Sequence, residues 1–395
     1  MANVSSSNGL EKYPKLRFKG FSEPWNAIRF GDIVDEYSDR TKEEDEDILL
    51  SAAIEGMFLN SELFDHQRGA SNKGYKKIDM GTLVLSTQNL HLGNANVNLR
   101  FEHGMVSPAY KTYHIHDCSI GLIAEWVKSE KAKRFFYDAT TVGASVCRRN
   151  VEWDTLYDQS LYLPSEAEQE RLAIFLTALS TRIKKQTELI EHLKKYKRGA
   201  SNSFFNDKAV SDSSSVLPFG QTVEINPKTK SLPTEFIYID LESVESGKLL
   251  QENIISRDNA PSRAQRVLTK GDVLFQMVRP YQKNNFYFES ELSLPAVAST
   301  GYAQIRCVDN DPLFVFEQIS SDYFANEAML RSTGTGYPAI NADSLAEIPF
   351  IKHPIEEQRK IGKFLYLLSQ RIIQEESKLE ALLKVKGAML QSLFI

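Results

Sequence analysis

Basic and amide side chains gather in two parts of this 395-residue sequence, and they are the residue types that bind polyanions. Arginine and lysine neutralise phosphates, and arginine, glutamine and asparagine also hydrogen-bond to the edges of nucleic-acid bases. Both groups surround a strand-like run, one beginning at Gly81 and the other at Gly271. For any single residue a solvated surface position is the simpler interpretation, but the recurrence favours a shared role. The candidate nucleic-acid-binding residues are Arg68, Lys73, Lys76, Lys77, Arg148, Arg149, Arg263, Arg266, Arg279 and Lys283.

No catalytic constellation is evident in the sequence. It has no P-loop for ATP hydrolysis, no Gly-x-Ser-x-Gly nucleophile motif and no Asn/Asp-Pro-Pro-Tyr-like segment of adenine methyltransferases. His91, His103, His114 and His116 have no cysteines or paired carboxylates at ligand spacing, which argues against a zinc site. The glycine-rich run 332–338 lacks the lysine of a phosphate-binding loop, so we interpret it as a tight turn. We predict no catalytic residue, no metal site and no cofactor for this chain.

Composition places the chain among ordinary globular proteins. It is 42% hydrophobic and 25% charged, with no apolar stretch as long as a membrane span and no signal-peptide core near Met1. Cys118, Cys147 and Cys307 are scattered and odd in number, which indicates reduced thiols and a cytoplasmic location. The net charge of −5 argues mildly against nucleic-acid binding by bulk electrostatics, but it is compatible with local basic faces.

The elements that must position these residues include two long amphipathic helices that repeat one another. Gln169 and Gln358 stand in similar acidic runs 189 positions apart (358 − 169), and apolar residues follow each in alternating steps of four and three. That spacing is typical of the a/d seam of a coiled coil. Both helices interrupt the seam at the same place, with Gln186 and Glu375. The predicted helix-pairing residues are Leu172, Leu176, Leu179, Ile183, Ile190, Leu193, Ile361, Leu365, Leu368, Ile372, Leu379 and Leu382.

The repeat extends into the segments that precede the helices. The run 81–86 corresponds to 271–276, and 107–110 corresponds to 299–302, in the same order and at similar spacing. We therefore predict an α+β fold in which two globular α/β domains alternate with two long helices, which pair as an antiparallel coiled coil with an internal two-fold repeat. The predicted boundaries are 1–15 for a flexible arm, 16–162 for the first globule, 163–206 for the first helix, 207–351 for the second globule and 352–395 for the second helix.

Local patterns predict some elements inside the globules. Strand-like runs lie at 82–86, 236–240, 273–278 and 313–316, and a helix is expected from Ile120 to Phe136. The segment 207–215 is typical of a polar linker.

Two similar globules on paired helices suit a target with two halves at a fixed separation. Antiparallel helices would place the globules around an approximate two-fold axis, and duplex DNA has the same kind of symmetry. One chain would then act as a dimeric DNA reader does, with the helices setting the distance between the half-sites. Because the globules differ in sequence, the half-sites can differ too.

Several motifs support this interpretation. They are Leu16-Arg17-Phe18-Lys19-Gly20-Phe21 with Trp25, Lys270-Gly271-Asp272-Val273-Leu274 with Arg279-Pro280, Ala298-Ser299-Thr300-Gly301-Tyr302, and Glu356-Glu357-Gln358-Arg359-Lys360-Ile361. In these motifs the chain resembles the specificity subunits of type I restriction-modification systems, from about Leu16 to Ile395. The first half departs from the last motif in 166–172 and has Thr82 where the second half has Asp272. We interpret both departures as structural.

The resemblance implies that each globule is a target-recognition domain reading one part of a bipartite double-stranded DNA sequence. It also implies that the helices dock two methyltransferase subunits, which use S-adenosylmethionine. A motor-nuclease subunit of the complex would use ATP and Mg²⁺. The chain itself is then expected to be a non-catalytic subunit with no cofactor and no membrane partner.

Two other interpretations stay open from the sequence. The chain could be a coiled-coil scaffold that bridges protein partners without reading DNA, and salt-dependent retention of duplex DNA would distinguish the two. A self-contained enzyme is disfavoured because motor, nuclease and methyltransferase motifs are missing from the sequence.

Overall fold

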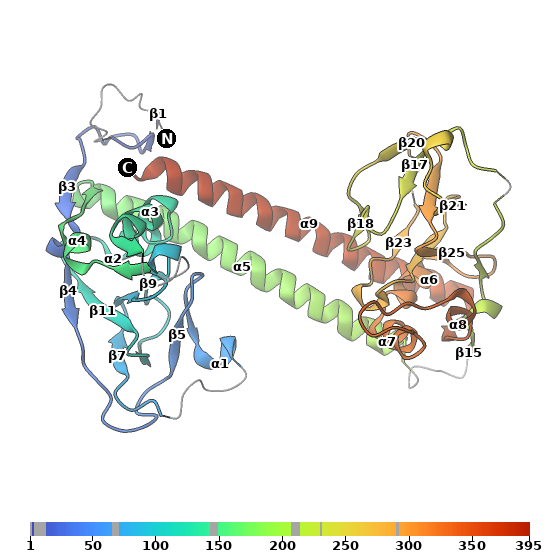
Figure 1. Ribbon diagram of the computed structural model, residues 1–395, viewed down its shortest axis with the longest axis horizontal. Helices are drawn as coiled ribbons and strands as arrows, with labels where there is room; N and C mark the ends of the chain where they lie inside the picture. Colours follow the sequence, from blue (N-terminus) through green and yellow to red (C-terminus); the bar gives the residue numbers. More distant parts are fainter. Residues whose placement is uncertain are drawn as a thin grey trace. The chain divides into compact units, whose positions relative to one another are not determined.

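The computed structural model describes residues 2–3, 13–64, 71–142, 149–206, 214–229, 231–289 and 292–395. The chain forms two compact units: unit 1 comprises Met1–Thr187 and Lys378–Ile395, and unit 2 comprises Glu188–Ser377. The long helices α5 (Glu166–Phe204) and α9 (Ile355–Leu393) each contribute one part to each unit (Figure 1). Helices and strands are both abundant, which confirms the predicted α+β class. The predicted domain boundaries, which follow elements rather than these units, stay a prediction.

Unit 1 is built around an antiparallel sheet with the strand order β4-β11-β8-β9. Further pairs join β7 to β10, β5 to β6, β12 to β13 and β3 to β14, and β1 (Ala2–Asn3) pairs with β2 (Leu16–Arg17). The other elements of the unit are β3 (Asn26–Arg29), η1 (Phe30–Asp32), β4 (Val34–Tyr37), β5 (Leu50–Ala52), β6 (Met57–Leu59), α1 (Asn60–Leu63), β7 (Lys76–Asp79), β8 (Leu83–Ser86), η2 (Leu90–Leu92), β9 (Ala95–Val97), β10 (His103–Val106), β11 (Tyr110–Ile115), α2 (Ile120–Trp126), α3 (Glu130–Asp138), β12 (Thr140–Val142), β13 (Arg149–Val151), α4 (Trp153–Asp158) and β14 (Ser160–Leu163).

Unit 2 contains an antiparallel sheet of the order β16-β25-β22-β23 and a mixed sheet of the order β20-β17-β24-β21, in which β17 and β24 are parallel. Two further strand pairs are β15–β26 and β18–β19. The elements are β15 (Ser215–Pro218), η4 (Phe219–Gln221), β16 (Glu224–Ile225), β17 (Glu235–Ile239), β18 (Val244–Glu245), β19 (Lys248–Leu249), β20 (Asn253–Ser256), η5 (Arg257–Asn259), β21 (Ala264–Val267), β22 (Val273–Gln276), η6 (Pro280–Gln282), β23 (Phe286–Tyr287), β24 (Ala296–Ser299), β25 (Tyr302–Arg306), α6 (Pro312–Ile319), α7 (Asp322–Leu330), α8 (Ala342–Ala346) and β26 (Pro349–Lys352).

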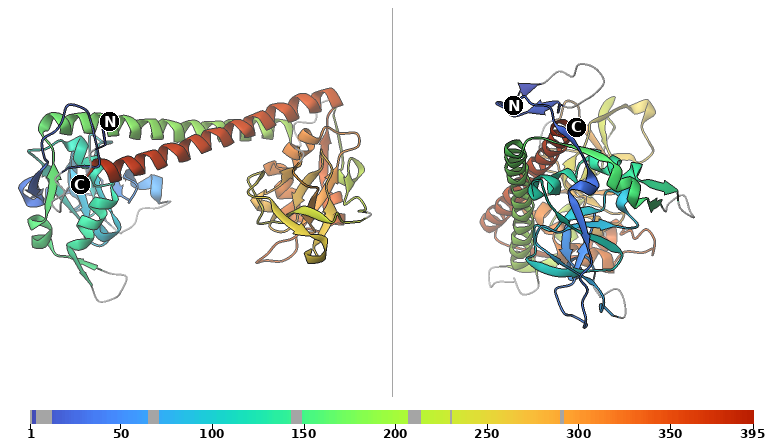
Figure 2. Two further views of the ribbon diagram at one scale, coloured as in Figure 1. Left: turned by 90° about the horizontal axis from the view of Figure 1, so that it is seen from above. Right: turned by 90° about the vertical axis from the view of Figure 1, so that its left-hand side faces the viewer.

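The long helices complete the hydrophobic core of each unit. In unit 1, Leu176 of α5 and Leu393 of α9 are fully buried in the cluster that contains Trp25. In unit 2, Leu365 of α9 is fully buried in a cluster with Phe205, which directly follows α5. Figure 2 shows the C-terminal end of α9 among the elements of unit 1. Neither globule therefore has a complete core without the helices.

The twelve predicted helix-pairing residues are all shielded from solvent. Leu172, Leu176, Ile190, Ile361, Leu365 and Ile372 are buried, and Leu179, Ile183, Leu193, Leu368, Leu379 and Leu382 are half-buried. Two apolar residues off the seam are exposed: Ile174 at 69% and Leu367 at 56%. The two polar interruptions, Gln186 and Glu375, are buried as well.

A buried glutamate in unit 1 is held by residues of both long helices. Ser180 of α5 donates a hydrogen bond to Glu125 of α2 at 2.5 Å. The ammonium of Lys386, from α9, lies 2.8 Å from the other carboxylate oxygen of Glu125 and 2.6 Å from the Ser180 hydroxyl. We call this trio a Glu–Ser–Lys clamp.

Unit 2 contains a second Glu–Ser–Lys clamp. Ser369 of α9 donates to Glu317 of α6 at 3.0 Å, and Lys197 of α5 lies 2.8 Å from the other carboxylate oxygen. The Glu317 side chain is only 1% exposed. In each clamp the serine and the lysine come from different long helices, so a single carboxylate fixes a globule helix to both.

Replacing Lys197 by methionine is expected to lower the free energy of unfolding of unit 2 by about 2 kcal/mol, because a hydrogen bond to a buried charge contributes on that order. The variant leaves the Glu317 carboxylate buried with the Ser369 hydroxyl alone. Lys195→Met, at an exposed position of the same helix, is the matched control. Amide hydrogen exchange of α6 measures the change, and equal protection in both variants would contradict it.

Helix α9 crosses α6 at a point where only glycine fits. A Cβ on Gly362 would lie 2.5 Å from the backbone nitrogen of Phe314 and 2.9 Å from the carbonyl carbon of Leu313. In unit 1, where α2 meets α5, the glycine is on the globule helix: a Cβ on Gly121 would lie 3.3 Å from the Cβ of Ala173. Both contacts are close, but the small residue comes from a different partner in each.

Two of the predicted local elements are wrong. The run 313–316, predicted as a strand, belongs to α6, because the Asp311 carboxylate accepts from the Phe314 amide at 3.0 Å and Pro312 fits the first turn of a helix. The predicted helix from Ile120 to Phe136 is two helices, since α2 ends at Trp126 and Ser129 caps the start of α3. The strands predicted at 82–86, 236–240 and 273–278 are confirmed as β8, β17 and β22.

Some predicted features lie outside the part of the chain that the structure describes. These are most of the polar linker 207–215 and most of the arm 1–15. Within the described ranges, no helix combines the length and the apolar character needed to cross a membrane.

Candidate nucleic-acid interface

Strands β7 of unit 1 and β21 of unit 2 carry three of the predicted basic residues. Lys76 and Lys77 belong to β7, which pairs antiparallel with β10. Arg266 belongs to β21, which pairs antiparallel with β24. Lys73 and Arg263 lie just before these strands. In both units the partner strand leads directly into the central sheet, through β11 in unit 1 and β25 in unit 2.

The three lysines of unit 1 differ in their surroundings. Lys73 is exposed. Lys76 is 5% exposed, and its burial lowers the pKa of its ammonium. Lys77 forms an ion pair with Glu46, and this hydrogen bond raises the pKa of Lys77 and contributes most to lowering the pKa of Glu46 to about 2. Lys73 is therefore the lysine best placed for an external anion.

Arg149 is held in place by its own unit. Its Nε donates to the Thr140 hydroxyl at 2.6 Å, and its Nη2 donates to the Thr140 carbonyl at 2.7 Å. The guanidinium carbon lies 4.1 Å from the centroid of the Tyr137 ring. Two further predicted residues, Arg68 and Arg148, lie outside the described residues.

In unit 2, four segments lie side by side, and three of them carry basic or aromatic residues. The Thr300 amide donates to the Arg263 carbonyl at 2.9 Å, and the Met277 amide donates to the Gly301 carbonyl at 3.0 Å. The Ile340 amide in turn donates to the Met277 carbonyl at 3.0 Å. These bonds join the start of β21, the turn between β24 and β25, the end of β22 and the segment before α8. They form one continuous edge, which we call the β21–β22 edge.

Two arginines of unit 2 have guanidinium groups with few contacts. The Nε atoms of Arg266 and Arg279 are buried, and neither has a hydrogen-bond partner among the described residues. Burial lowers the pKa of Arg266. The guanidinium of Arg279 lies over the ring of Tyr337, with 4.3 Å between the guanidinium carbon and the ring centroid.

Lys283 is engaged inside unit 2. Its ammonium is ion-paired with Asp322, the first residue of α7, and Arg198 of α5 lies 2.7 Å from the same carboxylate. Lys283 makes the largest contribution to the lowered pKa of Asp322. Lys283 is therefore already engaged within the unit, although it shares this carboxylate with Arg198.

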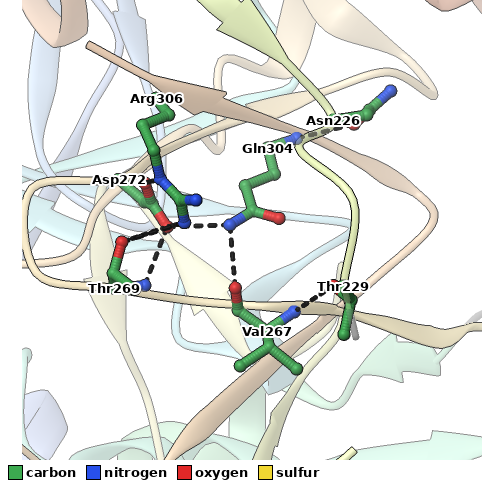
Figure 3. A network of polar contacts seen from close by, with 7 residues as sticks. All are labelled: Asn226, Thr229, Val267, Thr269, Asp272, Gln304 and Arg306. Atoms are coloured by element: carbon green, nitrogen blue, oxygen red, sulfur yellow. Dashed lines mark hydrogen bonds and ion pairs between the residues drawn. The ribbon is translucent and has the colours of Figure 1, made fainter. Parts of the chain in front are cut away.

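A polar network holds the turn that leads into β22 (Figure 3). The Asp272 carboxylate, on a residue that is 1% exposed, accepts from the Thr269 amide at 2.7 Å and from Gln304 Nε2 at 2.7 Å. Arg306 donates to it through Nε at 2.9 Å and through Nη2 at 2.8 Å. All donors to this carboxylate come from the unit itself, so Asp272 has a structural role.

Thr82 closes the corresponding turn of unit 1. Its hydroxyl accepts from the Asp79 amide at 3.2 Å, as Asp272 accepts from the amide three residues before it. A hydrogen bond of 2.7 Å joins the same hydroxyl to the Tyr37 hydroxyl. Thr82 in unit 1 and Asp272 in unit 2 therefore have different side-chain partners, but both accept a hydrogen bond from the amide three residues before them.

The groups that could carry metal or thiol chemistry are dispersed in the described residues. No cluster of three or more His, Cys, Asp or Glu side chains is placed there to hold a metal ion. Burial raises the pKa of Cys118 and Cys307 to about 12, which keeps both thiols protonated near neutral pH. His103 pairs with Asp47, and His114 stacks on Tyr37.

Contacts thus divide the predicted basic residues into two classes. Three have a side-chain partner within the chain: Lys77, Arg149 and Lys283. Five make no side-chain hydrogen bond or ion pair with any described residue: Lys73, Lys76, Arg263, Arg266 and Arg279. Sequence reasoning missed Tyr337, which is 70% exposed and lies in the run 332–338 that was predicted as a tight turn. An aromatic residue beside a proline in a glycine-rich turn was the available signal.

No protein-family model matches the chain, and no curated protein is significantly similar to it in sequence. Among solved structures, the S subunit of a type I restriction-modification system from M. genitalium is similar with a TM-score of 0.62 and 16% identity, covering 97% of this chain and 99% of that chain. The chain has the fold of that S subunit. A second similar chain comes from a solved structure described as showing complex assembly and conformational transition of the type I R-M system. The TM-score is 0.51 at 15% identity, and the alignment covers 93% of this chain and 96% of that one.

The S-subunit fold spans both units, because the alignment covers almost the whole chain.

Proposed function

We propose that this chain is the DNA-recognition and scaffolding subunit of a type I restriction-modification complex. The observation that carries the proposal is the S-subunit fold over 97% of the chain. Each globule would read one half of a bipartite DNA target, through β7 and its surroundings in unit 1 and through the β21–β22 edge in unit 2. Lys73, Arg263 and Arg279 support this assignment, because their side chains make no hydrogen bond or ion pair with any described residue.

We also propose that the two halves form an internal two-fold repeat. The matching strand orders β4-β11-β8-β9 and β16-β25-β22-β23 support it. The two Glu–Ser–Lys clamps support it further, because corresponding residues build both and the two long helices exchange roles between them.

The long helices would pair as an antiparallel coiled coil that sets the separation of the half-sites. Contacts within the units support this arrangement: Ser180 of α5 meets Lys386 of α9 in unit 1, and Lys194 of α5 lies 2.7 Å from Glu376 of α9 in unit 2. The partner number on α9 falls as the number on α5 rises, as in an antiparallel pair.

In this proposal the chain is non-catalytic and acts with two methyltransferase subunits docked on its helices, and through the complex with motor-nuclease subunits. S-adenosylmethionine, ATP and Mg²⁺ would be bound by those cytoplasmic partners. The net charge of −5 fits such a role, because partner subunits then supply much of the phosphate contact.

A methylome tests the proposal. The chain is expressed with its methyltransferase subunit in a host without adenine methylation, and modified adenines are mapped by long-read sequencing. A split motif that depends on this chain is expected. A soluble complex that yields no motif would contradict DNA reading.

A DNA-independent coiled-coil scaffold is the second candidate, favoured by the internal ion pairs of Lys77 and Lys283 and by the acidic net charge. Such a scaffold would bind the methyltransferase subunit but would not retain target duplex DNA at any salt concentration.

Lengthening both long helices by one turn is expected to lengthen the spacer of the target. Four residues inserted after Gln186 and four after Glu375 add about 6 Å of helix, which is roughly two base-pair steps of 3.4 Å. The methylome of this variant measures the spacing. An equal insertion between the exposed residues Glu43 and Glu44 should leave the spacer unchanged. An unchanged spacer in the helix variant would rule out a ruler.

A further inference from the structure

Arg279 adopts a backbone conformation that its residue type disfavours. Its φ of 54° and ψ of 57° are left-handed, and a proline follows it. Side chains with a Cβ rarely adopt this region, and the residue before a proline is restricted further. Hydrogen bonds impose the conformation: the Arg279 amide donates to the Pro338 carbonyl at 2.7 Å, and the Gln282 amide donates to the Arg279 carbonyl at 3.0 Å.

The fold does not require this conformation. In unit 1, Asn89 precedes η2 as Arg279 precedes η6, and Asn89 has a φ of −117°. Backbone strain of this kind concentrates at functional sites, where the surrounding structure maintains it. The strain at Arg279 therefore points to a role for its side chain.

The side chain of Arg279 is oriented but has no anionic partner. Its guanidinium lies over the Tyr337 ring, and no ion pair or side-chain hydrogen bond joins it to any described residue. Arg306 in the same unit shows the contrast, since Asp272 accepts two of its N–H groups. A fixed guanidinium with free donors is prepared for an acceptor from outside the chain.

Tyr337 is itself held by a short closed turn. Thr333 and Ala339 exchange two backbone hydrogen bonds, at 2.9 and 3.0 Å, and Gly334 has a φ of 91° that suits glycine. Tyr337 is 70% exposed, so the stack is at the surface of unit 2. The Tyr337 ring thus limits the movement of the guanidinium on one side.

We propose that Arg279, oriented by Tyr337, reads a guanine in the half-site bound by unit 2. This inference rests on the proposed function. An arginine fork whose plane is fixed matches the O6 and N7 acceptors of guanine in the major groove, where both hydrogen bonds must form together. A phosphate contact does not require a fixed plane, because a lysine can make it as a point charge. Pre-orientation by the stack therefore favours base reading.

The experiment compares methylomes of the full chain co-expressed with its methyltransferase subunit. Arg279→Ala is expected to relax one G·C position of the second half-site by about 10- to 100-fold, with the other positions and the first half-site unchanged. Arg279→Lys is expected to relax the same position, because lysine cannot form the planar fork. Tyr337→Ala should have a similar but smaller effect, and Tyr337→Phe should keep the wild-type motif.

Two further variants separate base reading from a structural role. Arg279→Gly relieves the left-handed backbone, so it should raise the melting temperature of the chain and still relax the G·C position. Arg331→Ala removes the same charge close to the same loop, but Arg331 is paired with Glu327 at 2.6 Å. It should leave the motif unchanged.

The outcomes are distinct. A wild-type chain that yields no motif overturns the proposed function, and the inference with it. A wild-type motif that Arg279→Ala leaves unchanged overturns the inference alone. A uniform weakening of the second half-site that Arg279→Lys restores assigns Arg279 to a phosphate and overturns guanine reading.

Discussion

Replacing Glu168 by alanine is expected to lower the free energy of unfolding of unit 1 by about 3–5 kcal/mol. The Glu168 carboxylate accepts two hydrogen bonds from Arg17, at 2.7 and 2.6 Å, and the two side chains are 1% and 4% exposed. The variant leaves a buried guanidinium without its counter-charge. Because Trp25, Trp126 and Trp153 are the three tryptophans and all lie in unit 1, urea unfolding followed by tryptophan fluorescence measures the change.

The control for Glu168 is Glu166→Ala, which removes an exposed carboxylate from the same first turn of α5. Its expected cost is about 0.5 kcal/mol, from the weaker interaction with the helix N-terminus. The double variant Arg17→Met/Glu168→Leu should regain much of the lost stability, since replacing a whole buried pair by apolar residues is often neutral. Unfolding of Glu168→Ala at the wild-type urea midpoint would contradict the prediction.

Gly362→Ala is expected to destabilise unit 2 by about 3 kcal/mol, although alanine is the better helix former. The new Cβ would meet the backbone of Leu313 and Phe314, which cannot rotate away as a side chain can. The Phe314 amide also forms the N-terminal cap of α6 with Asp311, so displacement disturbs that bond. Loss of hydrogen-exchange protection in α6 measures the effect.

Gly387→Ala is the matched control on the same helix. No atom lies within 4 Å of a Cβ built on Gly387, so only the helix propensity changes. This variant should stabilise the chain by about 0.8 kcal/mol. If both glycine variants raised the melting temperature, the close crossing of α6 and α9 would not constrain position 362.

The long helices could be predicted from the sequence because a buried stripe leaves a local, periodic record. The seam residues Leu176 and Leu365 are fully buried, while Ile174 and Leu367, on the same helices, are exposed. The strand β22 could also be predicted from a local pattern, because a short apolar run follows a glycine turn. The prediction of a strand at 313–316 was wrong because it followed the apolar run and not the helix-start signal of Asp311 and Pro312.

The candidate site could be predicted only in part. Basic residues near β21 and β22 are visible in the sequence, but their partners are not. Lys283 meets Asp322 from 39 positions away, and only the folded chain brings them together. Likewise, nothing local distinguishes Lys76, which is buried, from Lys73, which is exposed. The strain at Arg279 is a property of backbone hydrogen bonds that no residue pattern records.

The close-contact glycine lies on the globule helix α2 in unit 1 and on the long helix α9 in unit 2. This difference determines where the chain can be cut and rejoined in a chimaera. In the proposed two-fold repeat, a unit 2 globule grafted onto α5 would set Ala173, which already carries a Cβ, against the backbone of Leu313 and Phe314. In the reverse graft, with a unit 1 globule on α9, Gly121 would face Gly362, and the two glycines would leave a void. A junction placed inside the long helix, beyond the crossing, keeps each globule with the helical turns that fit it. The smallest transplantable piece is therefore a globule together with the first turns of its own helix.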